Sequence, residues 1–589
     1  MMSDLPIRNL RQFLKLLSER GLLREITAEV DPYLEIPEIH RRVIDQQGPA
    51  LFFKNVKGAR FPLVTNLFGT IERVNLAFGT RPTQFVKDLV RLSDELLPPT
   101  LGSLWNARGF LKQVPKIGLK NVKQAPILES GAMPPFFSRL PITTSWPEDG
   151  GPFITLPLVY TEHPRTGHHN LGMYRIHVYD DSTTGMHWQI HKGGGFHYHE
   201  AEKMNQPLPV AIFNGGPPAL MLSAIAPLPE NVPELMLASL LLGGKLDRVK
   251  VDGFQYPLIA EAEFAFCGEV MPHERRPEGP FGDHYGYYSL QHDYPVFRAK
   301  KFYHRSDAIF TATVVGEPRQ EDFFIGDYLQ DLLSPLFPKV MPAVKDLTSY
   351  GETGFHSLAA AQVELRYPGE SFGTGLRILG EGQLSLTKIL MLSDGSVPFR
   401  PFKRFLEYYL ERTEFEKDIH IFSQISQDTL DYTGPKVNEG SKMLWQALGE
   451  KKYELEIREP RELPKGVKDA RLFCSGCLVM QAEQAFSENQ DLGALLVKDP
   501  LLEEYRLLII VDDLEEALKS EMSFLWVVFT RFEPAADVKS KSVEYIRYHS
   551  VMKGPLLIDS RMKPWYPGKL IMTPEIVEKV TARWPQYFS

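Results

Sequence analysis

The segment Pro277-Glu278-Gly279-Pro280-Phe281-Gly282-Asp283-His284-Tyr285-Gly286-Tyr287-Tyr288 sets two carboxylates five residues apart on a backbone that contains three glycines. Glycine and proline keep this run out of a helix and let the backbone approach a ligand. The aromatic side chains can exclude water and so raise the pKa of a carboxyl group. Two interpretations stay open from these residues alone: a segment for acid chemistry built on Glu278 and Asp283, or a polar turn that joins strands.

Short strands are predicted on both sides of this segment, from about 125 to 325. Each is bounded by Gly, Pro, Asp or Asn, and their ranges are 153–160, 174–179, 186–190, 209–214, 249–251, 258–266 and 308–315. One helix interrupts them at 233–242, where a proline at the first turn is followed by Glu234. So many short strands favour a barrel.

The regions before and after the strands mix both kinds of element. Apolar residues at helical spacing over 10–17 are followed by a strand-like run at 22–26, which predicts a small α/β domain. The last region combines strands with amphipathic helices and ends in a helix at 574–585. We therefore expect three domains, at 1–115, 116–325 and 326–589.

The last region contains a repeat. The run 388–394 resembles the run 506–512, and each is followed by a predicted helix. Further on, Arg412, Asp418 and Ile419 correspond in order to Arg531, Asp537 and Val538. A duplicated strand-helix-strand unit is predicted, with copy one at about 380–445, a linker at 446–500 and copy two at about 501–565.

Composition narrows the class of protein. The 589 residues carry a net charge of -8, which argues against a bulk binder of nucleic acid or of an acidic membrane. Three cysteines are too few for a disulfide framework, and the start of the chain lacks a basic region followed by an apolar stretch. No apolar run approaches the roughly 18 residues that a membrane span needs. A cytoplasmic location is expected, peripheral to the inner membrane at most.

A second polar cluster lies between 170 and 200. His191 and Lys192 precede three glycines, which together offer a cation and exposed backbone N–H groups to a phosphate. The alternative is a solvated basic turn. Two pairs are weaker candidates: His197 and His199, which would share one face of a predicted strand, and Cys474 and Cys477, which lack a second pair. Surface histidines and ordinary thiols are the commoner cases.

Four ordered motifs resemble the UbiD family of decarboxylases that use prenylated FMN. They are Asn170 to Arg175, His191 to Gly193, Glu234 after Pro227-Leu228-Pro229, and Glu278 to Tyr288. The likeness begins near Asn66-Leu67-Phe68-Gly69 and extends to about 445, with a further partial match at the end of the chain. It implies an α/β (α+β) fold in which the central domain is a split β-barrel of the flavin-reductase-like type.

The resemblance also implies a cofactor and a metal. Loss of CO2 from an aromatic or α,β-unsaturated acid leaves an sp2 carbanion, which requires an electron sink such as a modified flavin. Family precedent places a divalent metal between protein and flavin phosphate, here at Asn170, His191 and Glu234. One amide oxygen, one imidazole and one carboxylate suit Mn2+ or Mg2+, with K+ as a further candidate ion.

Flavin and phosphate contacts follow from the same resemblance. They fall on Met173, Tyr174, Arg175, His187, Trp188, Gln189, Lys192, Gly193 and Lys388. Some family members have Arg at the positions of His187 and Lys192, and the loss of a bidentate donor weakens the inference there. The second copy has Arg506 at the position of Lys388, so only copy one is expected to serve the cofactor, and copy two is expected to be structural or interfacial.

Catalysis is expected to fall to Arg175, Glu278 and Asp283. Arg175 would orient the substrate carboxylate and pair with Glu278, while Asp283 would deliver the proton that replaces CO2. That role requires a raised pKa at Asp283, from burial or from the neighbouring Glu278.

The resemblance predicts a non-oxidative, reversible decarboxylase of an aromatic acid, such as a polyprenyl-4-hydroxybenzoate or another quinone precursor. Expected partners are the small acid, a flavin prenyltransferase that supplies the cofactor, and a second copy of the chain in a homodimer or higher oligomer. Nucleic acid is not expected, and membrane contact would be transient. Two alternatives stay open: an FMN-dependent reductase on the same barrel, and a non-catalytic assembly partner.

Overall fold

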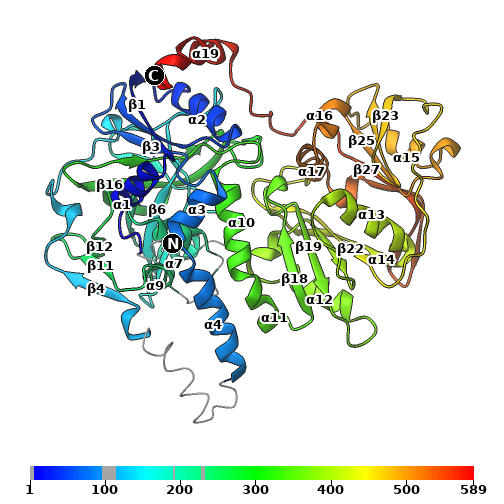
Figure 1. Ribbon diagram of the computed structural model, residues 1–589, viewed down its shortest axis with the longest axis horizontal. Helices are drawn as coiled ribbons and strands as arrows, with labels where there is room; N and C mark the ends of the chain where they lie inside the picture. The colour runs from blue at the N-terminus through cyan, green and yellow to red at the C-terminus, as the bar shows by residue number, and fades with distance from the viewer. Residues whose placement is uncertain (1–5, 96–113, 190–192, 227, 229–232, 589) are drawn as a thin grey trace. The chain divides into compact units, whose positions relative to one another are not determined.

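The computed structural model describes residues 6–95, 114–189, 193–226, 228 and 233–588 (Figure 1). The chain divides into two compact units. Unit 1 comprises Met1–Leu332 and Gly568–Ser589, and unit 2 comprises Leu333–Pro567. The chain therefore leaves unit 1 once and returns to it near its end. The three predicted domain boundaries stay a prediction.

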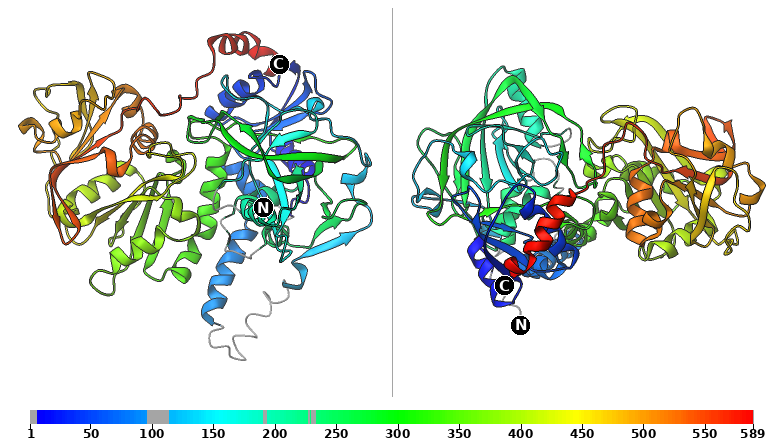
Figure 2. Two further views of the ribbon diagram at one scale, coloured as in Figure 1. Left: turned by 180° about the vertical axis from the view of Figure 1, so that it is seen from behind. Right: turned by 90° about the horizontal axis from the view of Figure 1, so that it is seen from above.

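Unit 1 is built from sheets with helices around them. Its helices are α1 (Leu10–Glu19), α2 (Glu35–Asp45), α3 (Ile71–Phe78), α4 (Arg81–Glu95), α7 (Gly193–Lys203), α8 (Pro218–Ile225), α9 (Glu234–Leu241), α10 (Glu321–Leu333) and α19 (Pro574–Phe588). The predicted first helix is α1, which Asn9 caps by accepting a hydrogen bond from the backbone of Gln12. The terminal helix α19 packs on α2 and β1 (Figure 2).

A six-stranded antiparallel sheet contains two of the candidate site residues, Asn170 on β7 and Glu278 on β13. Its order is β7 (His169–Gly172), β6 (Pro157–Glu162), β10 (Leu208–Asn214), β13 (Phe264–Glu278), β16 (His292–His304) and β9 (Thr183–Gly185). Two short pairs lie near it, β14 (Phe281–Gly282) with β15 (Tyr288–Ser289) and β5 (Phe153–Ile154) with β8 (Ile176–His177). A three-stranded sheet is formed by β12 (Leu258–Ile259), β11 (Leu246–Val249) and β4 (Leu119–Val122).

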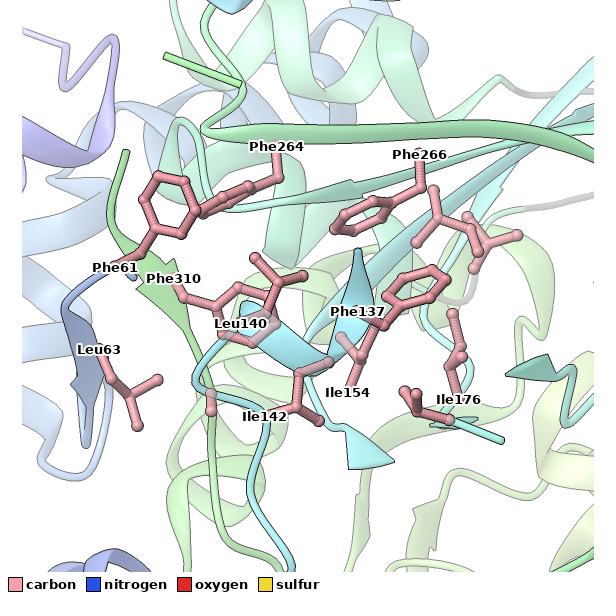
Figure 3. Close-up of a cluster of buried hydrophobic side chains, with 14 of the residues drawn as sticks. Phe61, Leu63, Phe137, Leu140, Ile142, Ile154, Ile176, Phe264, Phe266 and Phe310 are labelled. Atoms are coloured by element: carbon pink, nitrogen blue, oxygen red, sulfur yellow. The ribbon is translucent and has the colours of Figure 1, made fainter. Parts of the chain in front are cut away.

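The N-terminal region shares a sheet and a core with the strand-rich region. The four-stranded sheet runs β1 (Leu23–Val30), β2 (Ala50–Val56), β3 (Leu63–Thr65) and β17 (Phe310–Thr311). Its last strand therefore comes from the end of the central region. Figure 3 shows Phe61 beside Phe264 in the common core, with ring centroids 5.1 Å apart and nearly perpendicular. The N-terminal and central regions therefore pack through a shared hydrophobic core.

Unit 2 contains two five-stranded sheets of the same topology. The first has the order β18 (Val344–Ser349), β19 (Leu358–Val363), β20 (Ile389–Ser393), β22 (Glu439–Ala447) and β21 (Ile419–Ser426). The second has the order β23 (Val467–Cys474), β24 (Cys477–Ala482), β25 (Leu507–Val511), β27 (His549–Asp559) and β26 (Val538–Ile546). The helices are α11 (Phe337–Val340), α12 (Glu370–Ile378), α13 (Phe402–Arg412), α14 (Phe415–Asp418), α15 (Leu492–Leu496), α16 (Leu514–Leu518), α17 (Glu521–Thr530) and α18 (Pro534–Asp537).

The duplication is larger than the sequence indicated. Strands β23 and β24 lie inside the range 446–500 that was assigned to a linker, which corrects that assignment. They pair with β25 as β18 and β19 pair with β20, so each copy adds a hairpin before the predicted strand-helix-strand unit. Asp418 and Asp537 occupy equivalent positions in the predicted repeat. Each accepts a hydrogen bond from the backbone N–H of the residue four positions earlier, Glu414 at 2.7 Å and Glu533 at 2.8 Å.

The mixed α/β class predicted from the sequence is confirmed. The strand expected at His197 and His199 is wrong, because both residues lie on α7, where positions two apart point to different sides. In the described residues, no helix is long and apolar enough to span a bilayer.

Candidate active site

Arg175 and Glu278 form a buried, two-pronged ion pair in unit 1. Arg175 follows β7, and Glu278 is the last residue of β13. Nε of Arg175 donates to Oε1 of Glu278 at 2.8 Å, and Nη2 donates to Oε2 at 3.0 Å. The Glu278 side chain is fully buried. Such a fork fixes the plane of the guanidinium as well as its position.

Asp283 completes the trio from the other side of Arg175. It follows β14, and its Oδ2 accepts a hydrogen bond from Nη1 of Arg175. Its Oδ1 lies 2.8 Å from Nδ1 of His284 and accepts the backbone N–H of the same residue at 2.7 Å. Nη2 of Arg175 also donates to Oγ of Ser289 at 2.9 Å. The three residues expected to act in catalysis are therefore in direct contact.

The electrostatics of this trio differ from the sequence-based expectation. Burial is the largest single influence and raises the pKa of both acids, but Arg175 together with His187 at Glu278, and with His284 at Asp283, outweighs it. The pKa of Glu278 lies far below its ordinary value, and that of Asp283 is lowered to about 2 with help from His284. The expected rise at Asp283 is thus wrong for this arrangement, because its neighbour is a cation rather than a free carboxylate.

His187 supports the buried pair. It follows β9, and its Nδ1 lies 3.1 Å from Oε2 of Glu278, while Nε2 lies 3.2 Å from Nε2 of Gln189. Burial, together with the charge of Arg175, lowers the pKa of His187. Its expected contact with the flavin stays a prediction.

Asn170 and Glu234 converge on the start of α7. The carboxylate of Glu234 accepts the backbone N–H of Leu171 at 3.0 Å, next to Asn170. A Cβ on Gly193 would lie 2.1 Å from Oδ1 of Asn170, so any larger residue there would displace the Asn170 side chain from this position. Burial raises the pKa of Glu234, and no ion pair to it is found within the described part of the chain. A desolvated carboxylate beside an amide oxygen fits a divalent cation.

Neither His191 nor Lys192 can be placed, since both lie outside the described residues, as do Pro227 and Pro229. Among the residues that are described, no group of three or more His, Cys, Asp and Glu side chains could hold a metal ion. The predicted metal site therefore rests on Asn170 and Glu234 alone.

The region around Trp188 and Tyr174 fits a flavin and its phosphate. Nε1 of Trp188 is buried and has no hydrogen-bond acceptor in the described structure. A Cβ on Gly194 would come within 2.7 Å of that nitrogen, and the backbone N–H of Gly194 donates to the Tyr174 hydroxyl at 3.2 Å. Glycines at the amino end of a helix leave N–H groups available to a phosphate. Met173 lies next to Tyr174 in the same segment after β7.

Lys388 belongs to unit 2. Its Nζ lies 2.8 Å from Oδ2 of Asp431, and both side chains are buried. Its expected contact with the cofactor stays a prediction. The sequence interpretation missed Ser289 and the contact of His284 with Asp283, and it also missed Asp149, whose carboxylate accepts the backbone N–H of Gly282 at 2.7 Å.

Three family models match the chain in order. Models of the N-terminal domain, the Rift-related domain and the C-terminal domain of 3-octaprenyl-4-hydroxybenzoate carboxy-lyase match residues 14–93, 120–318 and 323–447. The third match ends at the last residue of β22, so copy two lies outside all three.

Full-length relatives include copy two. The chain is 48% identical over 581 residues to a protein of Chlamydia pneumoniae that is named as one subunit of a 4-hydroxybenzoate decarboxylase, and the match covers 98% of both chains. It is 47% identical to an uncharacterized protein of Chlamydia caviae over 584 residues, which is 99% of this chain and all of that one.

Two solved structures share the fold. Vanillic acid decarboxylase of Sedimentibacter hydroxybenzoicus matches with a TM-score of 0.67 at 24% identity, over 78% of this chain and 96% of that one. The UbiD-class enzyme HmfF of Pelotomaculum thermopropionicum, in complex with FMN, matches with a TM-score of 0.62 at 22% identity, over 75% and 94%. Since three family models match in order and full-length relatives are nearly half identical, the chain belongs to the UbiD family, the prenylated-FMN-dependent carboxy-lyases.

Proposed function

We propose that this chain is a non-oxidative, reversible decarboxylase of an aromatic acid of the 4-hydroxybenzoate type, a polyprenyl-4-hydroxybenzoate or another quinone precursor included. The observation that carries the proposal is the buried Arg175 held between Glu278 and Asp283. A guanidinium aligned by one carboxylate is ready to receive a second, from a substrate. The name of the chlamydial relative supports the choice of acid.

The carboxylate of a bound substrate can replace Asp283 as a hydrogen-bond partner of Arg175. Glu278 is tied to Arg175 by two hydrogen bonds and also meets His187, whereas Asp283 takes a single hydrogen bond from Nη1. The carboxylate of a bound acid would therefore displace Asp283 rather than Glu278. Glu278 stays ionised throughout and keeps the guanidinium in place.

This exchange would also make Asp283 an acid. When Arg175 binds the substrate carboxylate, its lowering effect on the pKa of Asp283 weakens, while burial still raises that pKa and His284 still lowers it. Asp283 then binds a proton more readily and can deliver it to the carbon that loses CO2. The low pKa of about 2 thus describes the protein before substrate enters, and the proton-donor role depends on the exchange.

The cofactor would lie at the start of α7. When bound, prenylated FMN supplies the electron sink for the carbon that loses CO2. Trp188, Gln189, Met173 and Tyr174 would contact it, and the glycines at the amino end of α7 would bind its phosphate. Asn170, His191 and Glu234 would hold Mn2+ or Mg2+ beside that phosphate, and Lys192 would pair with the phosphate itself.

Partners follow from the chemistry. A flavin prenyltransferase must supply the cofactor, and an isoprenoid substrate would require brief contact with a membrane surface. A homo-oligomer, or an assembly with a different chain, fits the naming of the chlamydial relative as one subunit of an enzyme.

The test begins with the full-length chain expressed together with a flavin prenyltransferase. We expect the bound cofactor to have the mass and absorbance of prenylated FMN, and we expect CO2 release from 4-hydroxybenzoate or a 3-substituted analogue. Ordinary FMN, with no CO2 from any aromatic acid in the screen, would contradict the proposal.

A matched pair of variants tests the role of Asp283 as the proton donor. Asp283→Asn removes the proton and should lower kcat by about 10²-fold or more, with bound flavin unchanged. Asp293→Asn, at an exposed position of β16, should have no effect.

A further inference from the structure

The loop that carries Asp283 is paired with a segment from the far end of the chain. We call Gly282–Tyr288 the acid loop and Gly568–Met572, where the chain re-enters unit 1, the return segment. The backbone N–H of Tyr288 donates to the carbonyl of Gly568 at 3.0 Å, and that of Leu570 donates to the carbonyl of Gly286 at 3.2 Å. Tyr287 and Lys569 form an antiparallel bridge between these bonds.

The buried side chain of Leu570 holds the return segment against the acid loop. Its side chain is 7% exposed and packs in a cluster with Leu34, Trp146, Tyr288, Val314 and Met572. The next residue, Ile571, is 67% exposed. One side of the return segment therefore holds the loop, while the other side faces solvent.

Asp149 holds the opposite end of the acid loop. One carboxylate oxygen accepts the backbone N–H of Gly282 at 2.7 Å, and the other accepts the N–H groups of Ser145 and Trp146 at 2.9 Å. A Cβ on Gly282 would lie 2.1 Å from the Trp146 ring, so this end of the loop rests directly on the indole. The ring also belongs to the cluster around Leu570. Both ends of the loop are thus fixed through Trp146.

We propose that Asp149 and Leu570 are positioning residues for proton delivery by Asp283. Among the described residues, neither side chain forms a hydrogen bond or an ion pair with the Arg175 trio. Each acts through the acid loop, and together they set where the Asp283 carboxyl group stands. The inference rests on the proposed function, since it assumes that Asp283 is the acid. A shift of about 1 Å in a reacting group can lower a rate by about 10²-fold.

Two matched pairs of variants test the proposal in the full-length, flavin-loaded chain with 4-hydroxybenzoate as the probe. Asp149→Asn places an amide NH2 against backbone N–H groups, whereas Glu148→Gln changes an exposed neighbour. Leu570→Ala empties part of the cluster, whereas Ile571→Ala alters the exposed side. Thermal midpoints and flavin content show which variants are folded and loaded. Where Leu570→Ala is unfolded at the assay temperature, Leu570→Val serves in its place.

We expect Asp149→Asn and Leu570→Ala to lower kcat by about 10- to 100-fold while KM changes by less than about twofold. Deuterium uptake from D2O into the product should slow by the same factor, because it reports the proton step and not the binding of the acid. Both controls should match the wild type.

Two results would overturn the inference in different ways. Wild-type kcat and deuterium uptake in folded Asp149→Asn and Leu570→Ala, beside an inactive Asp283→Asn, would remove the positioning role and leave the proposed function intact. Wild-type kcat in Asp283→Asn would instead remove Asp283 as the acid, and the inference with it.

Discussion

The two copies in unit 2 share one backbone fold but bury different charges. In each copy the strand pairs have the same order and the same relative directions. A turn contact also recurs, since Asp394 accepts the backbone N–H of Gly449 and Asp512 accepts that of Met562. The duplicated fold therefore depends on apolar strands and a few capping carboxylates, which both copies have.

The position before the central strand shows the difference. Lys388 and Arg506 are equivalent, because the carbonyl of each accepts a hydrogen bond from the neighbouring parallel strand, at 2.9 and 3.0 Å. Lys388 is paired with Asp431 in the interior. Arg506 instead lies over the ring of Phe415, with its guanidinium carbon 4.3 Å from the centroid. Lys388 also lies over the ring of Phe532, with Nζ 5.6 Å from the centroid, so the ion pair with Asp431 is what distinguishes the position in copy one.

A second buried lysine also occurs at a position of copy one that has no lysine in copy two. Lys442 of copy one donates to the carbonyls of Ser385 and Thr387, and by the strand register its equivalent in copy two is Pro555. Copy two has its own buried lysine, Lys563, but beyond the carboxyl end of β27. Both copies therefore bury a lysine ion pair, but at different positions of the shared fold.

The sharpest test of this difference replaces the two equivalent residues. Lys388→Ala leaves Asp431 buried without its partner and should lower the free energy of unfolding by about 3–5 kcal/mol. Arg506→Ala loses two cation–π contacts, with Phe415 and Tyr453, and a hydrogen bond to the carbonyl of Thr413, and should cost about 1–2 kcal/mol. Urea unfolding followed by tryptophan fluorescence measures both. Equal losses would contradict the distinction between the copies.

The same pair tests the expected cofactor role of Lys388. At a temperature where both variants are folded, Lys388→Ala should purify with less flavin than the wild type, and Arg506→Ala should not. Full flavin content in Lys388→Ala would limit this lysine to folding.

Titration of Lys442 provides the second test. Burial outweighs the pull of Asp431 and Asp428 and lowers the pKa of Lys442 to about 8, from 10.5 in the unfolded chain. Between pH 8 and pH 10.5 the unfolded chain binds more protons at this lysine than the folded chain does, so the free energy of unfolding rises with pH across this window. Below about pH 8 the folded chain carries the full cost of burying the charge. Relative to Lys442→Met, the wild type should gain on the order of 3 kcal/mol from about pH 8 to 10.5. The exposed Lys436→Met is the control, and a flat difference would contradict the shift.

Much of this architecture could be predicted from the sequence. The repeat was found because apolar strands and the residues after them recur in order, which needs no knowledge of distant contacts. The hairpin β23–β24 was missed, because the charged segment 450–468 at its start was interpreted as part of a linker between the copies. The predicted strand at His197 failed because three glycines precede it and their conformation is set by packing against Asn170 and Trp188.

Part of the candidate site could also be predicted from the sequence, and part could not. The convergence of Arg175, Glu278 and Asp283 followed from the family resemblance, and the geometry brings them together. The low pKa of Asp283 could not be foreseen, since it depends on how closely Arg175 and His284 approach its carboxylate in the folded chain. Asp149 was missed because it binds only backbone N–H groups, a role that leaves no pattern in side-chain chemistry.

The contact between the copies gives the smallest expected effect. The carboxylate of Glu521 in copy two accepts the backbone N–H groups of Phe402 and Lys403, at 2.8 and 3.2 Å, and so caps the first turn of α13 in copy one. Glu521→Gln keeps one acceptor oxygen and loses the charge, which should cost about 1 kcal/mol. The exposed Glu504→Gln should cost nothing measurable. Because α13 also packs on β23, urea unfolding of Glu521→Gln should keep a single transition for the two copies, and a separate transition would mean that each copy folds alone.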